Sequence, residues 1–480
     1  MSRASLQRAV LALVAFAVVV APAHGQATPA AGAPARRALI RAGRLIDGLA
    51  DAPRSDQGVL VEGERIVAVG PYAELAGRAE GADRIDLSGM TVLPGLIDNH
   101  THVLLQGDIT AADYDEQLLK ESIPYRTIRA TVAARTALLN GFTTIRDLET
   151  EGAMYADVDL KTAIARGIVP GPHMFVATRA FAPTGMYPLL GYSWELKMPE
   201  GVQIVDGPDE IRKAVREQVK YGADWIKVYA DRRYYVAADG RLRSWVNFTD
   251  EEFKAFVDEA HRLGRKVAAH AVAWDGVDAA LRAGVNTIEH GDGLTPDLID
   301  RMVKQHVYWC PTIYVGVYVA QGRGGAWPKM IELERQAFGV ALKRGMLPLI
   351  SFGTDAGGYA WTENQAKEFG YMVKYGMTPM QAIKSATSVA ARLLDQEDSL
   401  GTVAPGRYAD LIATKGDPLA DVAELERVKF VMKGGLVYRN DRRGRNDNVG
   451  EGRSRGAARR GAAEARTRPD SPPVAHLGAK

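Results

Sequence analysis

Between about residues 96 and 395, short β-like runs alternate with helical stretches, and this alternation restricts the possible fold more than any other feature of the chain. Such alternation is typical of repeated βα units around a parallel sheet. Thr249 with Glu252 and Thr378 with Gln381 have the spacing of capping boxes at helix starts. The strand candidates are residues 95–103, 143–148, 173–177, 225–229, 266–272, 287–290, 307–313 and 349–354. We predict an α/β fold, a closed (β/α)8 TIM barrel, with its chemistry at the C-terminal ends of the strands.

Short alternating segments with Gly and Asp turns flank this region and predict further strands. They occupy residues 38–40, 58–61, 65–69 and 91–93 before it, and 408–414, 428–433 and 436–438 after it. Two β-rich pieces at opposite ends of a chain are most simply two parts of one domain. We predict a small β-sandwich domain from residues 37–93 and 396–440, with the barrel spanning residues 94–395.

The two termini have compositions of their own. Arg3 and Arg8 precede an apolar run at residues 9–20, a pattern that predicts a cleavable signal peptide over residues 1–25 and a spacer over 26–36. The run is shorter than the roughly 20 apolar residues of a spanning helix. We expect a periplasmic or secreted protein with no membrane span after cleavage. Residues 441–480 are rich in Arg, Gly, Ala and Pro and predict a disordered basic tail.

Composition restricts the partners and the type of metal site. The net charge of +2 over 480 residues gives no electrostatic reason to expect a nucleic acid, so a small-molecule substrate is the better expectation. The single cysteine, Cys310, excludes an intrachain disulfide and a thiolate cluster. Any metal site must therefore use nitrogen and oxygen ligands. A homo-oligomer remains open.

A pair of histidines closes the first predicted barrel strand. Residues 98–102 have the sequence Asp-Asn-His-Thr-His, so alternation along a strand directs His100 and His102 to the same side. Two converging imidazoles can hold a divalent metal ion. An H-x-H pair alone is weak evidence for such a site, because short motifs also arise by chance.

The fourth predicted strand carries a lysine in an apolar context. Lys227 lies between Ile226 and Val228, where a bare ammonium inside a barrel is costly. Such a lysine, with a lowered pKa, can react with carbon dioxide to give a carbamate that bridges two metals. The alternative is a lysine paired with a carboxylate at the barrel mouth.

Three more candidates end the fifth, sixth and eighth predicted strands: His270, His290 and Asp355. Each has an ordinary alternative, a satisfied core histidine or a helix N-cap aspartate. The chain has nine histidines, and the four candidates are those placed at C-terminal strand ends. The other five lie in the signal peptide, the tail, a helix, the segment before the seventh strand or the start of the third: His24, His476, His261, His306 and His173.

The run Leu-Pro-Gly-Leu-Ile-Asp at residues 93–98 leads into the histidine pair, and the later candidates follow in order. This pattern resembles the metal-dependent amidohydrolase superfamily, and within it the imidazolonepropionase-like branch. Members of that branch with a strand-four lysine resemble exported dipeptidases and carboxypeptidases, including prolidase-like and ochratoxin-hydrolysing enzymes. The resemblance covers the barrel and the flanking β domain, including residues 401–403 and 409–410.

The resemblance implies a metal-binding set for two divalent ions, with zinc expected first and manganese, cobalt or iron as alternatives. His100, His102 and Asp355 would bind one ion, and His270 and His290 would bind the other. Carboxylated Lys227 would bridge the two ions. A hydroxide shared by the two ions would attack the scissile carbonyl. Asp355 would carry the proton to the departing amine.

Other residues are weaker candidates. Tyr229 lies two residues after Lys227 and could contact a substrate carboxylate or the oxyanion, or only line the barrel. Asp98 could orient an imidazole or only accept backbone bonds.

A substrate carboxylate would need a cation, and three arginines follow strands three and four, Arg179, Arg232 and Arg233. The loop over residues 181–207 is long enough to act as a lid.

Together these patterns predict an exported binuclear amidohydrolase that cleaves peptide-like amides, as a dipeptidase or carboxypeptidase, or N-acyl amino acids such as ochratoxin. Hydrolysis of a cyclic amide, amidine or lactone on the same site is the enzymatic alternative. A catalytically inactive binding protein is the alternative from another class, and it would require the loss of ligands.

Overall fold

The computed structural model describes residues 36–107, 111–187, 189, 191–322 and 324–441. The predicted signal peptide, all but the last residue of the spacer, and all but the first residue of the basic tail lie outside the described residues. No helix in the described part of the chain is both long and apolar enough to cross a membrane.

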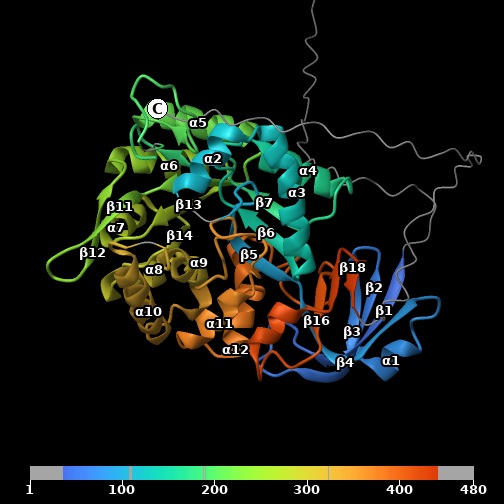
Figure 1. The fold of residues 1–480 in the computed structure, drawn as a ribbon. Coiled ribbons are helices and arrows are strands. Elements are labelled where there is room, and N and C mark those ends of the chain that lie inside the picture. The colour runs from blue at the N-terminus through green and yellow to red at the C-terminus, as the bar shows by residue number, and fades with distance from the viewer. Residues whose placement is uncertain (1–35, 108–110, 188, 190, 323, 442–480) are drawn as a thin grey trace, which may run out of the picture. The chain divides into compact units, whose positions relative to one another are not determined.

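Parallel strands and helices alternate through the middle of the chain, as predicted (Figure 1). One parallel sheet contains β5 (Leu96–Thr101), β6 (Phe142–Asp147) and β7 (His173–Val176). A second runs in the order β15-β14-β13-β10-β8-β9, with β15 (Tyr308–Cys310), β14 (Thr287–His290), β13 (Lys266–Ala271), β10 (Trp225–Tyr229), β8 (Phe181–Ala182) and β9 (Gln203–Ile204). A hairpin of β11 (Asp231–Val236) and β12 (Leu242–Val246) follows β10. Seven of the eight predicted barrel strands are therefore confirmed.

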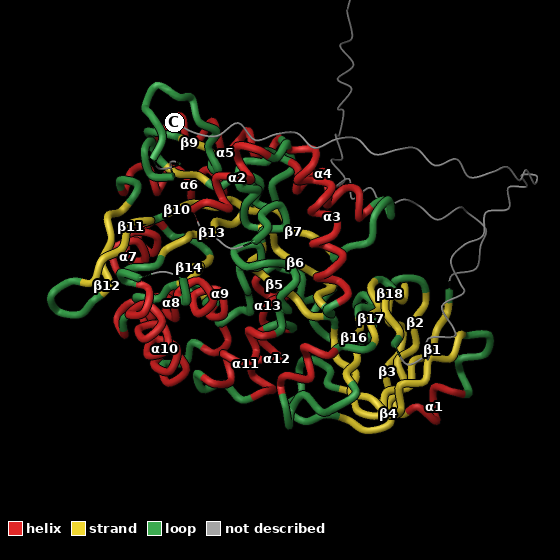
Figure 2. The backbone as a smooth tube through the Cα atoms, in the orientation of Figure 1, coloured by secondary structure: helices red, strands yellow, loops and turns green. Residues whose placement is uncertain are grey.

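The helices lie around these strands (Figure 2). They are α2 (Ala111–Lys120), α3 (Ile123–Leu139), α4 (Ala156–Ala165), α5 (Pro208–Lys220), α6 (Asp250–Arg262), α7 (Trp274–Ala283), α8 (Pro296–Gln305), α9 (Ile313–Ala320), α10 (Trp327–Lys343), α11 (Lys367–Lys374), α12 (Pro379–Ser385) and α13 (Ser388–Leu393). Both predicted capping boxes are present, at Thr249 with Glu252 and at Thr378 with Gln381. Strands such as β13 are buried on both faces, because helices cover one side and the barrel interior the other.

The eighth predicted strand, residues 349–354, is wrong as a continuous strand. Residues Leu347–Leu349 form a short 3-10 helix, and the following segment makes only isolated parallel bridges, Trp309 with Ile350 and Thr101 with Ala356. The Thr354 N–H is shared between the His100 carbonyl at 3.3 Å and the Asp98 carboxylate at 3.1 Å, and the Thr354 hydroxyl donates to Asp98 at 2.6 Å. A carboxylate thereby competes with the backbone ladder at this residue.

Strands from both ends of the chain form one seven-stranded sheet, as the blue and red arrows of Figure 1 show. Its order is β18-β17-β16-β4-β1-β2-β3, with β1 (Arg37–Leu45), β2 (Arg54–Glu62), β3 (Arg65–Pro71), β4 (Asp83–Pro94), β16 (Leu411–Thr414), β17 (Phe430–Lys433) and β18 (Leu436–Asn440). Two short elements accompany it, α1 (Tyr72–Ala76) and the 3-10 helix Val422–Arg427. The ladders establish one sheet, and the sandwich of two packed layers stays a prediction.

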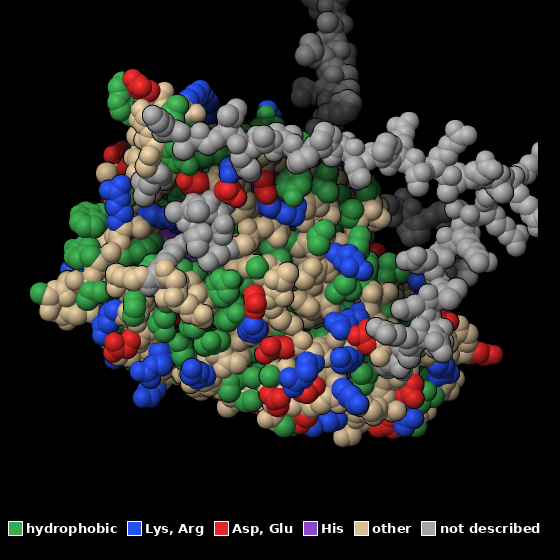
Figure 3. Space-filling model, viewed as in Figure 1, with side chains coloured by type: hydrophobic (Ala, Val, Ile, Leu, Met, Phe, Trp, Pro, Cys, Tyr) green, Lys and Arg blue, Asp and Glu red, His purple; other side chains and the backbone are tan. Residues whose placement is uncertain are grey.

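Charged side chains of both signs are interspersed over the face drawn in Figure 3. Many are joined in pairs, such as Arg344 with Asp300 and Lys329 with Glu332. This distribution agrees with the near-neutral net charge of +2. On that face, no large field of one sign distinguishes a surface for a polyanion.

Candidate metal centre

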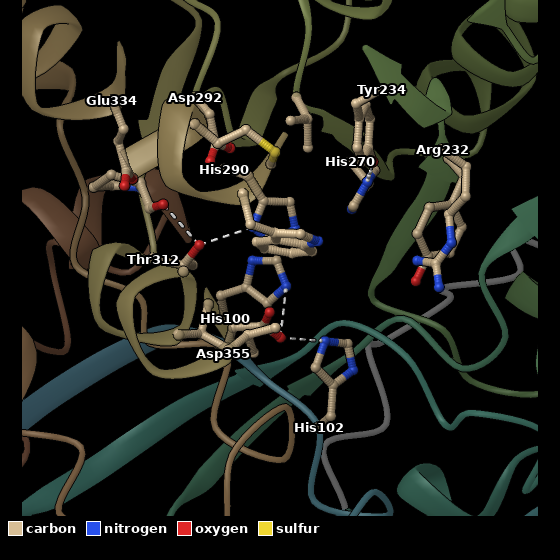
Figure 4. Close-up of a pocket in the computed structure, with 18 of the residues that line it drawn as sticks. His100, His102, Arg232, Tyr234, His270, His290, Asp292, Thr312, Glu334 and Asp355 are labelled. Atoms are coloured by element: carbon tan, nitrogen blue, oxygen red, sulfur yellow. Dashed lines mark hydrogen bonds and ion pairs between the residues drawn. The ribbon is translucent and has the colours of Figure 1, made fainter. Parts of the chain in front are cut away.

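The six predicted ligand residues converge on one cavity of about 290 Å³. Each comes from the C-terminal end of a barrel strand or from the turn that follows it, as the fold predicts. Figure 4 shows the imidazoles of His100 and His290 above Asp355, His270 farther up beside Tyr234, and His102 below them. The lining includes all six residues, His100, His102, Lys227, His270, His290 and Asp355.

Asp355 links the first two histidines. Its Oδ1 lies 3.0 Å from His102 Nε2 and 3.7 Å from His100 Nε2, and one ligand atom from each of the three residues lies within 4.8 Å of the others. Burial alone would raise the pKa of Asp355, but the hydrogen bond from His102 and the neighbouring imidazoles hold that pKa well below its usual value. The carboxylate is therefore ionised and suited to a metal ion.

Three histidines present the same nitrogen to the cavity. The Nδ1 of His100 donates to Glu289 Oε2 at 2.8 Å, and the Nδ1 of His102 donates to the Glu149 carbonyl at 3.3 Å. The Thr312 hydroxyl donates to the Pro311 carbonyl, so it accepts from His290 Nδ1, which lies 2.8 Å away. With the proton on Nδ1, the Nε2 of His100 and of His290 keeps a lone pair for a metal ion, and His102 Nε2, which contacts Asp355, would do so once a metal ion displaced its proton.

The fourth histidine, His270, lies beside His290, with ring centroids 4.6 Å apart. Its Nε2 is hydrogen-bonded to the Tyr234 hydroxyl at 2.5 Å. Burial lowers the pKa of His270 well below its usual value and that of His290 to about 4. Both rings are therefore neutral, which is the form that binds metals.

Lys227 is buried, with 1% of its surface exposed, and its Nζ lies 3.5 Å from His100 Nε2. Within the described residues, no carboxylate lies within 4.0 Å of that amine, so the alternative of a lysine paired with a carboxylate is not supported. Burial lowers the pKa of Lys227. A buried amine without an ion-pair partner, beside the His100 ring whose pKa burial lowers, fits conversion to a carbamate.

The six residues together fit a pair of divalent ions. Four imidazoles, one ionised carboxylate and one lysine open to carboxylation give nitrogen and oxygen ligands without a thiolate. The negative charge of Asp355 and of a Lys227 carbamate would offset the charge of the ions.

A buried network behind His100 was missed by sequence reasoning. Glu289 accepts from His100 with one oxygen, and its other oxygen accepts from Arg146 at 2.8 Å and from the Thr287 hydroxyl. Arg146 also donates to the Asn99 carbonyl at 2.7 Å. A carboxylate that holds the far side of a metal-binding histidine fixes its tautomer and orientation. The only sequence signal was a Glu next to His290 within a buried strand.

Unusual backbone conformations occur at three residues of the site. His290, Thr312 and Asp355 have positive φ values of 72°, 54° and 59°. Non-glycine residues rarely adopt this region, and such strain concentrates at functional sites. The positive φ of His290 allows its ring to lie beside the His100 ring. The preceding residue, Glu289, contacts His100 as well.

The weaker candidates separate in the structure. The Tyr229 hydroxyl lines the cavity but donates to Glu149 Oε2 at 2.6 Å. Asp98 contacts no imidazole among the described residues. Its carboxylate accepts from the His100 N–H, from Thr354 and from Gln365. The predicted role of Asp98 in orienting an imidazole is therefore wrong, and the alternative, that it accepts bonds from the backbone, holds.

Of the three candidate arginines, only Arg232 lines the cavity. Its guanidinium lies over the Tyr187 ring, 4.0 Å from the centroid, and Tyr187 comes from the loop that was predicted to form a lid. Arg179 and Arg233 instead donate to the carbonyls of Val202 and Gly185. Arg232 is thus the cavity cation that sequence alone could not select.

Three more carboxylates line the cavity and were also missed, Glu151, Asp292 and Glu334, and of these Glu151 accepts from the hydroxyls of Tyr114 and Tyr187. Asp292 is two residues beyond His290, and Glu334 lies within α10. Burial raises the pKa of Glu334 well above its usual value, and the nearby Asp292 adds to that effect. Their sequence context, a turn and an amphipathic helix, carried no sign of a site.

Comparison with known proteins decides the family. Residues 91–437 match the amidohydrolase family, and residues 58–79 match the imidazolonepropionase-like composite domain of bacteria. The chain belongs to the amidohydrolase family. The amidohydrolase match covers the whole region of alternating strands and helices and the strands β16 and β17 of the seven-stranded sheet, and it includes all six candidate ligands.

Several amidohydrolases resemble this one along most of its length. Ochratoxinase from Aspergillus niger is 29% identical over 442 residues, covering 84% of this chain and 87% of the relative. The solved structure of a Xaa-Pro dipeptidase with bound methionine is 35% identical, with a TM-score of 0.75, and covers 84% of this chain and 100% of the other. Imidazolonepropionase from Chloroflexus aggregans is 23% identical over 417 residues, covering 80% and 92%.

These comparisons confirm the predicted superfamily and branch and a TIM-barrel-like α/β fold. This amidohydrolase is a metal-dependent hydrolase that acts on carbon–nitrogen bonds. The alternative of an inactive binding protein required lost ligands, whereas all six residues gather at one cavity.

Proposed function

We propose that this amidohydrolase is an exported binuclear enzyme that cleaves peptide-like amide bonds, as a dipeptidase or carboxypeptidase. The observation that carries the proposal is the convergence of four histidines, one aspartate and an unpaired buried lysine on one cavity. The lysine argues for two ions, because a carbamate at Lys227 can bridge them.

His100, His102 and Asp355 would hold one divalent ion, and His270 and His290 a second, with carboxylated Lys227 between them. We propose zinc as the ion. When bound, the ions would polarise the scissile carbonyl and make a water acidic enough to attack at neutral pH. Glu289 would keep the His100 ring oriented, and Thr312 would do the same for His290.

Asp355 is the proposed proton carrier. Its carboxylate is ionised, faces the cavity and lies among the imidazoles that surround the reacting bond. In that place Asp355 would take a proton from the attacking water and deliver it to the departing amine nitrogen. Tyr229, whose hydroxyl contacts Glu149, remains a predicted contact of the substrate or the oxyanion.

Arg232 is the proposed partner of a substrate carboxylate. It lines the cavity on the side of Tyr234 and His270 (Figure 4), and its guanidinium lies over the Tyr187 ring. The planar guanidinium group presents a fork of N–H donors that matches the two oxygens of a carboxylate. A peptide with a free C-terminus supplies that group.

The similar proteins support the same substrate class. One relative is named for Xaa-Pro dipeptides and another for ochratoxin, and both cover most of this chain. The likeness to imidazolonepropionase favours the second candidate, hydrolysis of a cyclic amide on the same site.

The test is turnover of the purified mature protein against Xaa-Pro, Xaa-Arg and Xaa-Lys dipeptides, N-acyl-phenylalanines and a set of lactams. Release of free amino acids that is lost on chelation and restored by zinc is the expected result. Hydrolysis confined to the lactams would replace the peptidase proposal by the cyclic-amide one. No hydrolysis of any amide by the metal-loaded protein would overturn both.

Two structural proposals accompany the function. We propose that the eight strand segments close into a barrel, supported by the bonds of Ser351 N to Trp309 O at 2.8 Å and Asp355 N to His100 O at 2.7 Å.

We also propose export by the signal peptide of residues 1–25 to the periplasm or the medium. Sequencing the N-terminus of the protein recovered from periplasm and medium tests export, and an uncleaved cytoplasmic chain would contradict it.

A further inference from the structure

The cavity has an acidic end that the proposed chemistry does not use. Asp292 follows β14, and Glu334 lies on the face of α10 that also carries Met330. Both carboxylates line the cavity although they are nearly buried, with 8% of Asp292 and 2% of Glu334 exposed. Neither belongs to the six candidate metal ligands.

Neither carboxylate has a side-chain partner among the described residues, and Asp292 accepts only from its own backbone N–H. Across the described ranges, no hydrogen bond or ion pair joins the carboxylate of Asp292 or Glu334 to another side chain, and the charge that most influences Glu334 is that of Asp292. Beside Glu334 the wall is a glycine, because a Cβ built on Gly316 would lie 3.9 Å from Glu334 Oε2. Two buried acids that face an open cavity without a cation are costly in the empty state.

The acidic end is continuous with the proposed reaction site. Thr312 holds His290 by a hydrogen bond and begins the face of α9 on which Gly316 lies one turn later. In Figure 4, Asp292 and Glu334 lie on one side of His290, while Tyr234 and Arg232 lie on the other. The proposed catalytic residues therefore lie between the end that holds Arg232, beside which Glu151 is bonded to Tyr187, and the end that holds Asp292 and Glu334.

The walls near the acidic pair are apolar. Val315 and Val319 of α9 and Met330 of α10 line the same cavity. An apolar passage that ends at two carboxylates matches an alkyl stem that ends in a cation, as in lysine or arginine. A small neutral side chain would leave both acids without a partner.

We propose that Asp292 and Glu334 form a subsite for a substrate ammonium or guanidinium group, and hence that this enzyme prefers peptides that carry a cation. The inference rests on the proposed amide-hydrolase function and names its substrate class. Arg232 would hold the carboxylate at one end while the acidic pair holds the cation at the other. The cation can be a lysine or arginine side chain or the α-ammonium group of a dipeptide.

Matched substrates separate these sources. Norleucine has the length of lysine without the terminal ammonium, so lysyl-phenylalanine is compared with norleucyl-phenylalanine, and phenylalanyl-lysine with phenylalanyl-norleucine. Each is tested with a free and an acetylated N-terminus. The free and acetylated pairs isolate the α-ammonium group, and the order of residues shows which side chain enters the subsite.

The variants are Asp292→Asn and Glu334→Gln, with Glu332→Gln as the control. Glu332 lies on the same helix, but it is exposed and paired with Lys329. We expect each cavity variant to lower kcat/KM for the cationic substrates by about 10- to 100-fold relative to their neutral counterparts. The control should leave that ratio unchanged, and the amides should not lower the melting temperature, because each removes an unpaired buried acid.

The ratio of cationic to neutral substrates decides the inference. A ratio that stays at the parent value in both cavity variants, or a parent enzyme that prefers the neutral substrates, overturns the subsite while turnover itself keeps the amide-hydrolase proposal. No turnover of any substrate overturns the proposed function instead. A binding measurement tests the subsite without turnover. Butylguanidinium should bind the metal-loaded parent protein more tightly than it binds the metal-loaded Glu334→Gln variant, and equal affinities overturn the subsite.

Discussion

At the scale of single residues, the site depends on side chains that hold the ligands as much as on the ligands. The His100 ring is fixed because Glu289 accepts its Nδ1–H, and Glu289 is in turn fixed by Arg146, all of them buried. A ring held in this way presents Nε2 without losing conformational freedom when a metal binds.

Glu289→Gln tests this positioning role. The amide keeps one acceptor but loses the charge that pairs with Arg146, so we expect metal affinity to fall by about 10-fold or more. Metal content at limiting zinc is the measurement, and excess zinc should restore much of the turnover. If the variant keeps the parent affinity, Glu289 supports only the fold.

Asp355→Asn tests the proposed proton carrier. The amide cannot accept the proton, so we expect kcat to fall by about 100-fold or more while the folded state persists. Turnover of the metal-loaded variant is measured beside its melting curve. Hydrolysis at the parent rate would show that another group carries the proton.

The ligands could be predicted from sequence because strand ends of a barrel meet at one face, and His100, His102, Lys227 and His270 obey that rule. The side-chain directions of His290 and Asp355 could not be predicted from sequence. Both residues have positive φ values, 72° and 59°, and no residue pattern indicates such values. Asp292 and Glu334 are close only through the packing of α10, which is a long-range property.

At the scale of elements, local signals were reliable where a few neighbouring residues decide the structure. The capping box of α6 is an example: the Thr249 hydroxyl accepts from Glu252 N at 3.3 Å, and Glu252 Oε2 accepts from Thr249 N at 2.9 Å. Glu252 also accepts the Gly207 N–H at 2.8 Å, so the cap connects α6 to the start of α5.

Thr249→Ala should lower the free energy of unfolding by about 1 kcal/mol, because it leaves a helix N–H without its acceptor. Urea unfolding of the variant is compared with that of Thr249→Ser, which keeps the hydroxyl and should unfold near the parent midpoint. Equal midpoints for all three proteins would mean that water caps the helix as well as Thr249 does.

The eighth strand shows where element prediction fails. Its apolar run and its final Asp355 have the pattern of a buried strand, yet the segment forms only isolated bridges. The segment is bonded to a residue that is distant in the sequence. Asp98 accepts from Thr354, 256 residues away, and from Gln365, 267 residues away. A local pattern cannot contain such contacts.

At the scale of the whole molecule, the chain ends meet in one sheet in which β4 pairs with both β1 and β16. The sequence predicted that the two pieces belong together, because two β-rich pieces at opposite ends of a chain are most simply parts of one domain. The strand order could not be predicted, since β1 pairs in parallel with β4 and antiparallel with β2.

The central claim is that six residues from separate strands hold two metal ions, with Lys227 between them. The most direct test is elemental analysis of the parent protein and of Lys227→Ala, with dipeptide turnover measured on the same samples. We predict about two zinc ions per parent chain, and in the variant a sharp loss of both bound metal and activity. A variant that keeps the parent metal content and turnover would contradict the binuclear site.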